Sequence, residues 1–470
     1  MQKFILDKLT EITNNKLISF HVPGHKLGKV YDKLGYTNIL NSIYKMDTTE
    51  ILGTDNLHSP EGIIKKSQHR ASEVFKSEST YYLINGSTCG IQAAIMSVCN
   101  PKEKIIVNRD CHQSVINALI LGDIDVEYIS PNVDTNNILK GINVEHAISI
   151  IDNNLDAKAI LLTYPTYYGM VYDLNMICEY AHSKEMLVIV DEAHGAHLGL
   201  SDKLPRTALE QGADIVIQST HKTLPSFTQS SMMHIQGDMV NKDKLETMLR
   251  IIESSSPSYL LMSSLELAVD IYDINGKNLM EELLENINRF KANMSDIRNI
   301  DIYCSDDKTK IFISSKNLGI TGYELDEILR IHYNIQVELS NYYGVLLITT
   351  IGNDRDDFKA LEQALECISS KYIYNNPINN IEYPMSMPIK ILSPREAFYN
   401  SKKSVKIYDS IGKICGEYII PYPPGISLVS PGEIISQEII DYILICKKRG
   451  MNISGMKDST LEYIQIIDKQ

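Results

Sequence analysis

The chain has 470 residues, 44% of them apolar and 22% charged, and its 45 basic and 59 acidic side chains give a net charge of −14. This length predicts two or three domains. The acidic balance argues against nucleic acid or an anionic membrane surface as partner, since both need a basic face. No apolar run is long enough to predict a membrane span. Eight cysteines without a CxxC pair predict free thiols, and hence a reducing, cytoplasmic location.

Residues 1–56 form an N-terminal segment whose first seventeen residues mix helically spaced apolar side chains with charges, unlike a signal peptide. In residues 57–264, short apolar runs alternate with helical patterns. The runs lack strict alternation and predict buried parallel strands, and they lie at residues 104–107, 159–163, 187–190 and 215–217. Helices are expected between them at 91–99, 112–121 and 175–184. This rhythm predicts an α/β sheet with helices on both faces and ligand chemistry at the strand carboxyl ends.

The second half of the chain has a different texture. Residues 265–372 predict a smaller α+β domain with long helices at 279–294 and 356–369. The stretch 374–380 (YNNPINN) is polar and interrupted by proline, which is typical of a linker. Residues 381–470 are expected to form a third, small domain.

Two polar residues follow neighbouring strands of the predicted sheet. Asp191 ends the run LVIVD, and Lys222 lies in QSTHK directly after the run IVI. Each alone is ambiguous, because a strand-end carboxylate can cap a turn and a strand-end lysine can be solvated. They are 31 residues apart, which leaves room for one strand–helix–strand crossover. Both side chains are therefore expected in one crevice.

Upstream, residues 85–90 (NGSTCG) form a small polar turn before an apolar helix. Free backbone N–H groups and the helix dipole make such a turn a candidate anion cradle. A phosphate cradle, then a strand-end aspartate, then a strand-end lysine is the set that pyridoxal 5′-phosphate (PLP) requires. Lys222 would form the Schiff base, and Asp191 would keep the pyridine nitrogen protonated. The order resembles the aspartate-aminotransferase-like (fold type I) PLP enzymes, which implies a mostly parallel sheet in a three-layer α/β/α domain.

More specific segments resemble the bacterial ornithine/lysine/arginine decarboxylase family, in its short Gram-positive form. They span nearly the whole chain in order, and two of them are not general features of PLP enzymes: residues 20–26 (FHVPGHK) and 421–433 (PYPPGISLVSPGE). The others are 57–64 (LHSPEGII), 110–114 (DCHQS), 191–195 (DEAHG) and 219–222 (STHK) with 228–231 (TQSS). The resemblance implies PLP-dependent decarboxylation of a basic L-amino acid: arginine to agmatine first, then lysine to cadaverine or ornithine to putrescine.

The resemblance also assigns roles to residues. Lys222 is the Schiff-base lysine, Asp191 bonds the pyridine nitrogen, His112 stacks on the open face of the ring, and His194 lies near the ring. The remaining cofactor contacts are expected from Ser87, Thr88, Thr166, Ser219 and His221.

Glu433 falls where the family places a carboxylate facing the distal cation of the substrate. A buried cation needs such a partner, because burying an unpaired charge is costly. The alternative for Glu433 is an N-terminal acid on the helix expected at 434–444. The resemblance further implies a homodimer with shared active sites, to which the segment 20–26 is a candidate contributor. No metal is expected: His194 and His197 have a suitable spacing, but PLP accounts for the region better.

Alternatives remain open from the sequence. Asn56 stands where short members often have a second acid, and residues 223–227 (TLPSF) lack a glycine found in some arginine-specific members; both differences leave the substrate undecided. An aminotransferase or aldolase on the same fold is the second hypothesis, with Arg330 as a candidate clamp for an α-carboxylate. A non-catalytic paralogue is the third, although it would have no physical need for the complete PLP set.

Overall fold

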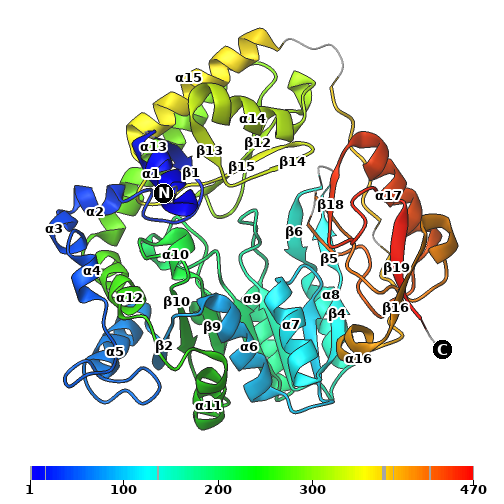
Figure 1. Ribbon diagram of the computed structural model, residues 1–470, viewed down its shortest axis with the longest axis horizontal. Coiled ribbons are helices and arrows are strands. Elements are labelled where there is room, and N and C mark those ends of the chain that lie inside the picture. The colour runs from blue at the N-terminus through cyan, green and yellow to red at the C-terminus, as the bar shows by residue number, and fades with distance from the viewer. Residues whose placement is uncertain are drawn as a thin grey trace.

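The computed structural model describes residues 3–15, 17–134, 137–372, 377–384, 386–422 and 425–468. Residues 374–376 of the expected linker and the prolines at 423 and 424 lie outside these ranges. The chain forms a body around a large sheet, a second body around a smaller sheet, and a C-terminal segment beside the large sheet (Figure 1).

The large sheet has seven strands in the order β2-β10-β9-β8-β7-β3-β4. All run parallel except β10, which is antiparallel to both of its neighbours. The strands are β2 (Ser79–Leu83), β3 (Lys104–Asn108), β4 (Asp125–Ile129), β7 (Ala159–Thr163), β8 (Leu187–Asp191), β9 (Ile215–Gln218) and β10 (Ser231–Ile235). The four runs predicted as buried parallel strands are β3, β7, β8 and β9, so that expectation is confirmed.

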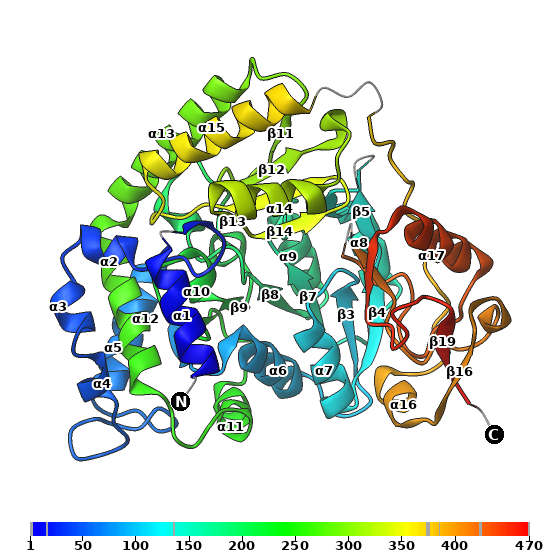
Figure 2. The same cartoon turned by 45° about the horizontal axis from the view of Figure 1, so that its top comes forward.

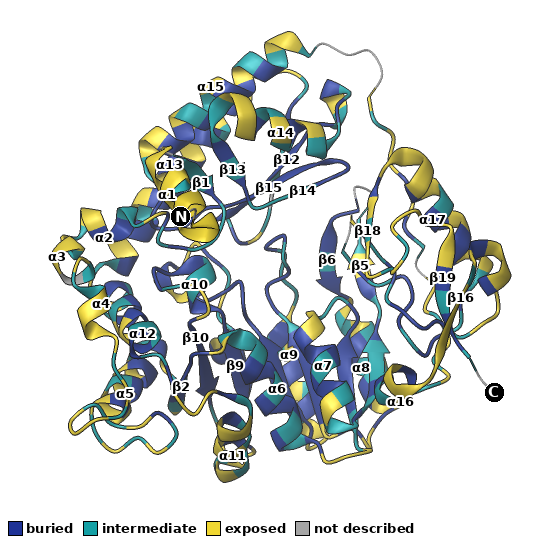
Figure 3. Cartoon of the chain, in the orientation of Figure 1, coloured by how far each residue is buried: buried dark blue, intermediate teal, exposed yellow. Residues whose placement is uncertain are grey.

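Helices cover both faces of this sheet, and successive strand residues face opposite layers. In β8, Ile189 packs in the apolar core beneath α6, α7 and α11, whereas Val188 and Val190 pack in the core on the other face. The helices are α5 (Ile63–Phe75), α6 (Gly86–Val98), α7 (Gln113–Gly122), α8 (Val144–Asp152), α9 (Leu174–Ser183), α10 (Thr220–Thr223), α11 (Lys242–Ile252) and α12 (Tyr259–Ile271). Figure 3 shows the buried strands between half-exposed helices. This is the predicted three-layer α/β/α arrangement.

One connection differs from the expectation. Between β8 and β9 the chain forms no α-helix but two 3-10 turns, η1 (Leu198–Leu200) and η2 (Leu209–Gln211). Residues 192–198 are buried and pack beneath the second body instead of covering the sheet as a helix.

The second sheet is antiparallel, in the order β11-β12-β15-β14. It contains β11 (Asp301–Cys304), β12 (Lys310–Ser314), β14 (Leu339–Asn341) and β15 (Gly344–Ile348), with α13 (Lys277–Met294), reached through a π-helical turn (Tyr272–Gly276), α14 (Gly322–Tyr333) and α15 (Arg355–Lys371). A 3-10 turn (Lys316–Leu318) follows β12. Figure 2 shows these helices above the sheet.

The N-terminal segment joins this second body. Strand β1 (Ile18–Phe20) pairs in parallel with β13 (Ile335–Val337), and Phe20 is fully buried. Residues 20–26, expected to reach a partner's site, are therefore folded against their own chain. The flanking helices are α1 (Phe4–Asn14), α2 (Lys29–Lys33), α3 (Thr37–Leu40) and α4 (Ile43–Met46).

The C-terminal segment packs around an apolar core that includes Ile419, Val429 and Ile440 and is shared with side chains of the other two bodies, among them Leu139 and Leu346. Its elements are α16 (Pro394–Tyr399), β16 (Lys402–Lys406), a 3-10 turn (Ile407–Ser410), β17 (Ile420–Tyr422), α17 (Gln437–Arg449), β18 (Asn452–Ser454) and β19 (Tyr463–Ile467). It lies beside the hairpin of β5 (Pro131–Val133) and β6 (Leu139–Ile142). Across the described ranges, no helix combines the length and the apolar character that crossing a membrane requires.

Candidate functional site

Asp191 and Lys222 do project from adjacent strand ends. Asp191 is the last residue of β8 and pairs in register with Ile217 of β9. Lys222 lies on α10, the single helical turn that follows β9. The Asp191 carboxylate is 3% exposed, and its Oδ1 accepts the backbone N–H of Ala193 at 3.1 Å. Burial raises the pKa of Asp191, while the positive charge of Lys222 opposes that rise.

Lys222 contacts His194 directly, with 3.0 Å between its Nζ and the ring Nε2. Burial lowers the pKa of the Lys222 amine and holds the pKa of His194 well below its usual 6.5, so the imidazole is neutral. A neutral ring has one donor and one acceptor nitrogen, so Nε2 can accept from the Lys222 ammonium or donate to its neutral amine. Nδ1 is buried and has no hydrogen-bond partner.

His112 lies on the same side of the sheet, at the start of α7. Its Nδ1 accepts the backbone N–H of Ser114 at 3.2 Å, which fixes the ring as a helix cap. Burial lowers the pKa of His112; the negative charge of Asp191 opposes this shift, and the positive charge of Lys222 adds to it. The structure therefore brings Lys222, His194, Asp191 and His112 together.

The expected anion cradle is also present. Helix α6 begins at Gly86, whose positive φ of 74° turns the chain into the helix. The Ser219 hydroxyl donates to Ser87 Oγ at 2.7 Å, which ties the cradle to the turn before Lys222. Thr88 follows in the first turn of α6. His221 Nδ1 bonds the Ser230 carbonyl at 2.8 Å and so anchors the other side of α10.

The donor set fits PLP. A cofactor with an aldehyde, a ring nitrogen and a phosphate needs an amine, a buried carboxylate and N–H or O–H donors. Lys222, Asp191 and the α6 cradle supply these. In addition, the hydroxyls of Thr220 and Thr223 beside Lys222 are buried without a hydrogen-bond partner, as is His194 Nδ1. Buried polar groups are normally paired, so unpaired polar atoms on α10 and on His194 are consistent with a ligand site.

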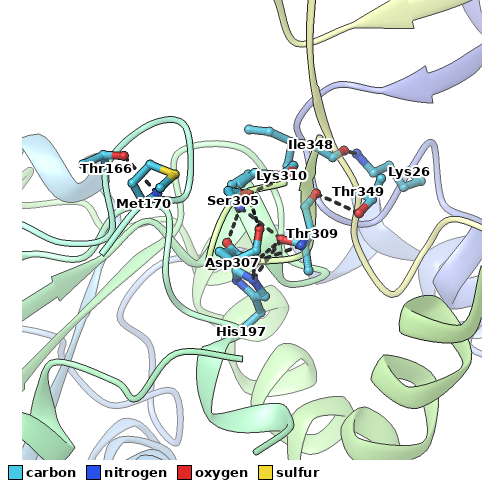
Figure 4. Close-up of polar contacts among 10 residues, drawn as sticks. All are labelled: Lys26, Thr166, Met170, His197, Ser305, Asp307, Thr309, Lys310, Ile348 and Thr349. Carbon is cyan, nitrogen blue, oxygen red and sulfur yellow. Dashed lines mark hydrogen bonds and ion pairs between the residues drawn. The ribbon is translucent and has the colours of Figure 1, made fainter. Parts of the chain in front are cut away.

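Two expected contacts have partners within the chain. Thr166 is fully buried, and its Oγ1 accepts the Met170 N–H at 3.1 Å, which closes a turn (Figure 4). Glu433 is 2% exposed and receives two hydrogen bonds from Arg109, at 2.6 and 2.7 Å. It also precedes α17, which begins at Gln437. Glu433 thus has an internal partner in place of the expected substrate, and it does not lie in the first turn of that helix.

Sequence reasoning missed three residues that connect to Lys222 through His194: Tyr167, Glu338 and His21. The Tyr167 ring packs edge-on to His194, with 4.7 Å between ring centroids, and its hydroxyl donates to Glu338 Oε1 at 2.8 Å. His21 Nδ1 lies 2.8 Å from Glu338 Oε2. His21 falls within the segment 20–26 that the resemblance singled out, so that segment was a signal. Glu338 follows β13, and no local pattern marks it.

A buried charged cluster joins the two bodies next to this site. His197 Nε2 and Lys310 Nζ contact the two oxygens of Asp307, at 3.1 and 3.0 Å (Figure 4). Asp307 and Lys310 are both fully buried. His197 therefore pairs with Asp307, whereas His194 contacts Lys222. Across the described residues, no three His, Cys, Asp or Glu side chains are grouped as a metal site would need.

Comparisons with known proteins identify the family of this chain. Residues 5–313 match the family model described as "Orn/Lys/Arg decarboxylase, major domain", and residues 382–461 match its "C-terminal domain". The arginine decarboxylase of Bacillus subtilis (strain 168) is 36% identical over 469 residues, covering 96% of this chain and 95% of that protein. The arginine decarboxylase of Bacillus anthracis is 34% identical over 477 residues, covering 98% and 96%.

Among solved structures, the lysine decarboxylase of Francisella novicida matches with a TM-score of 0.79 at 23% identity, over 98% of this chain and 80% of that one. This likeness confirms the predicted fold. The two family models and the Bacillus relatives lead to one conclusion: the chain is a member of the Orn/Lys/Arg decarboxylase family.

Proposed function

We propose that the protein is a PLP-dependent decarboxylase that converts arginine to agmatine, with lysine and ornithine as the next candidate substrates. The observation that carries the proposal is the Lys222 amine, held 3.0 Å from a neutral His194 beside the buried Asp191. The near-full-length relatives named arginine decarboxylase favour arginine. They also favour decarboxylation over the aminotransferase and paralogue hypotheses.

When bound, PLP supplies an electron sink for the bond that releases carbon dioxide. Burial keeps Lys222 less basic than a free lysine, so a larger share of its amine is neutral and nucleophilic. Asp191 would pair with the ring nitrogen, and Ser87, Thr88, Ser219 and His221 would hold the phosphate. His194, in contact with Lys222, is placed to exchange a proton with that amine. His112 would cover the open face of the ring.

The candidate arginine clamp does not fit a role in the site. Arg330 is exposed on α14, in the last turn of that helix. A decarboxylase gains nothing from clamping the α-carboxylate, because that contact stabilises the ground state that must break down. The position of Arg330 therefore supports decarboxylation over transamination.

The experiment is to load the purified protein with PLP, record its near-ultraviolet and visible absorbance, and measure carbon dioxide from arginine, lysine and ornithine separately. We expect gas from arginine, and neither the PLP absorbance band nor gas in Lys222→Ala. Turnover that requires a keto-acid acceptor would instead identify an aminotransferase. A bound-PLP band with no gas from any of the three amino acids would contradict the proposal.

We further propose a division into an N-terminal segment (1–56), a PLP-binding domain (57–264), a small domain (265–372) and a C-terminal domain (381–470), assembled as a homodimer in the cytoplasm. The exposed apolar side chains of Ile51, Leu52 and Tyr44 suit an interface. Light scattering should give twice the chain mass of 53.1 kDa. A fully active monomer would contradict the shared-site arrangement.

A further inference from the structure

Glu338 is an ionised carboxylate whose partners come from two segments distant from it in sequence. Its Oε1 accepts the Tyr167 hydroxyl at 2.8 Å, and its Oε2 accepts the Val22 N–H at 3.0 Å and lies 2.8 Å from His21 Nδ1. The side chain is 7% exposed. Burial alone would raise its pKa, but these contacts, led by His21, lower it to about 2. Glu338 is therefore negatively charged at any working pH.

This charge lies next to the reacting lysine. Tyr167 connects Glu338 to His194, whose Nε2 contacts Lys222 Nζ. The negative charges of Asp191 and Glu338 both raise the pKa of Lys222 against the effect of burial. Asp191 lies at the strand end, where the cofactor ring nitrogen is expected. Glu338 comes from the second body, which lies across the site from the large sheet (Figure 1).

Two other buried carboxylates near the site have a cationic partner. Glu433 is held by two hydrogen bonds from Arg109, and Asp307 is paired with Lys310. Glu338 differs, because its fixed donors are a neutral amide and a neutral hydroxyl. Its third partner is His21, whose side chain is 44% exposed although the Nδ1 that faces Glu338 is buried and makes no hydrogen bond, so this is the partner that an incoming group can replace.

We propose that Glu338 is the specificity-determining residue of this enzyme: its carboxylate receives the distal cation of the basic amino acid, which takes the place of His21 at Oε2. A guanidinium or ammonium brought from water needs a charged, hydrogen-bonding partner to offset its desolvation. Glu338 takes the role that the sequence had given to Glu433. The inference rests on the proposed function, since it presumes a basic substrate.

The test separates recognition of the distal charge from general support of the fold. PLP-loaded protein is titrated with agmatine, which has a distal cation, and with pentylamine, which lacks one, while the absorbance of the bound cofactor is followed. In Glu338→Gln we expect the Kd of agmatine to rise about 30-fold or more, with little change for pentylamine. Glu417→Gln is the matched control, because Glu417 is a buried carboxylate of the C-terminal segment that accepts only backbone N–H groups.

His21→Ala provides the second measurement, and it applies even if Glu338→Gln fails to fold. If the cation displaces His21, this variant should bind agmatine as tightly as the wild type or more tightly. Equal weakening of both amines in Glu338→Gln, or loss of agmatine binding in His21→Ala, would overturn the inference. Failure of the proposed function looks different: the wild type would bind agmatine yet release no carbon dioxide from any basic amino acid.

Discussion

Lys26 is a buried lysine without a carboxylate in contact with its amine. Its side chain is 2% exposed, and Nζ donates to the carbonyls of His21 and Ile348, both at 2.8 Å; Figure 4 shows the contact with Ile348. Burial lowers its pKa from 10.5 to about 7; the charges of Glu338 and Asp357 oppose this, and that of Lys310 adds to it. A residue that is charged when unfolded and largely neutral when folded makes stability depend on pH.

The sign of that dependence follows from the two pKa values. Between pH 10.5 and about 7 the unfolded chain keeps a proton on Lys26 that the folded chain releases. The contribution of Lys26 to the free energy of unfolding is therefore fully present above pH 10.5 and is lost as the pH falls towards 7. We expect the wild type to lose up to about 1.4 kcal/mol per pH unit relative to Lys26→Met. Urea unfolding at pH 7, 8, 9 and 10 measures this difference.

Lys29 offers a control of opposite sign. Burial alone would lower its pKa, but contacts with Asp357 and Asp354 outweigh burial and raise it. The contribution of Lys29 to the free energy of unfolding is therefore fully present below pH 10.5. Between pH 10 and 7 the wild type should show no such loss relative to Lys29→Met. Parallel curves for the wild type and Lys26→Met would show that Lys26 stays charged in the folded protein.

At the scale of elements, residues 20–26 lie between α10 and the second body and contact both. The Gly24 N–H donates to the His221 carbonyl at 2.8 Å, and its own carbonyl accepts the Thr350 hydroxyl at 2.6 Å. A side chain does not fit here: a Cβ on Gly24 would lie 2.5 Å from the Leu224 carbonyl oxygen and 2.9 Å from the backbone of Thr223. The glycine lets this segment lie directly against the helix that carries Lys222.

Gly24→Ala should therefore displace Lys222 without unfolding the protein. Misplacing a reacting group by about 1 Å costs on the order of 100-fold in rate. We expect kcat for carbon dioxide release to fall by about 10- to 100-fold. Gly35→Ala is the control, since Gly35 has a positive φ but open space around it, so it should lose stability without a change in rate. Wild-type kcat in Gly24→Ala would mean that α10 tolerates the shift.

Elements and site were not equally predictable. The strand ends and the turn before α6 carry local signals, so Asp191, Lys222 and Ser87 could be placed from the sequence. Glu338 could not, because it meets Val22 only through a contact that spans 316 residues. Glu433 shows the converse limit: its position in the chain suggested a cation partner correctly, but only the fold shows that this cation is the chain's own Arg109.

At the scale of the whole molecule, Arg109 and Glu433 connect the C-terminal segment to the loop between β3 and α7, which carries His112. Arg109 precedes His112 by three residues, and its Nε also donates to the Ser427 carbonyl at 3.0 Å. Both charged side chains are 3% exposed. The C-terminal segment thus fixes the loop that presents His112 to the site.

Removing one member of this pair leaves a buried charge without its partner. Glu433→Gln should lower the free energy of unfolding by about 3–5 kcal/mol. Glu438→Gln, an exposed position on α17, should change it little. Urea midpoints of the three proteins measure the effect. A midpoint for Glu433→Gln equal to that of the wild type would contradict the importance of the pair.

The pairing of β1 with β13 has a consequence for how the enzyme is made. Ile18 meets Ile335, a residue that leaves the ribosome 317 positions later. At about 5 to 20 residues per second, roughly 15 to 60 s separate the synthesis of the two strands. Until then residues 20–26 have no sheet to join, and the backbone of α10 lacks its neighbour. A nascent chain can therefore complete its large sheet well before residues 20–26 pack against the helix that carries Lys222, so the surroundings of Lys222 are completed only at the end of biosynthesis.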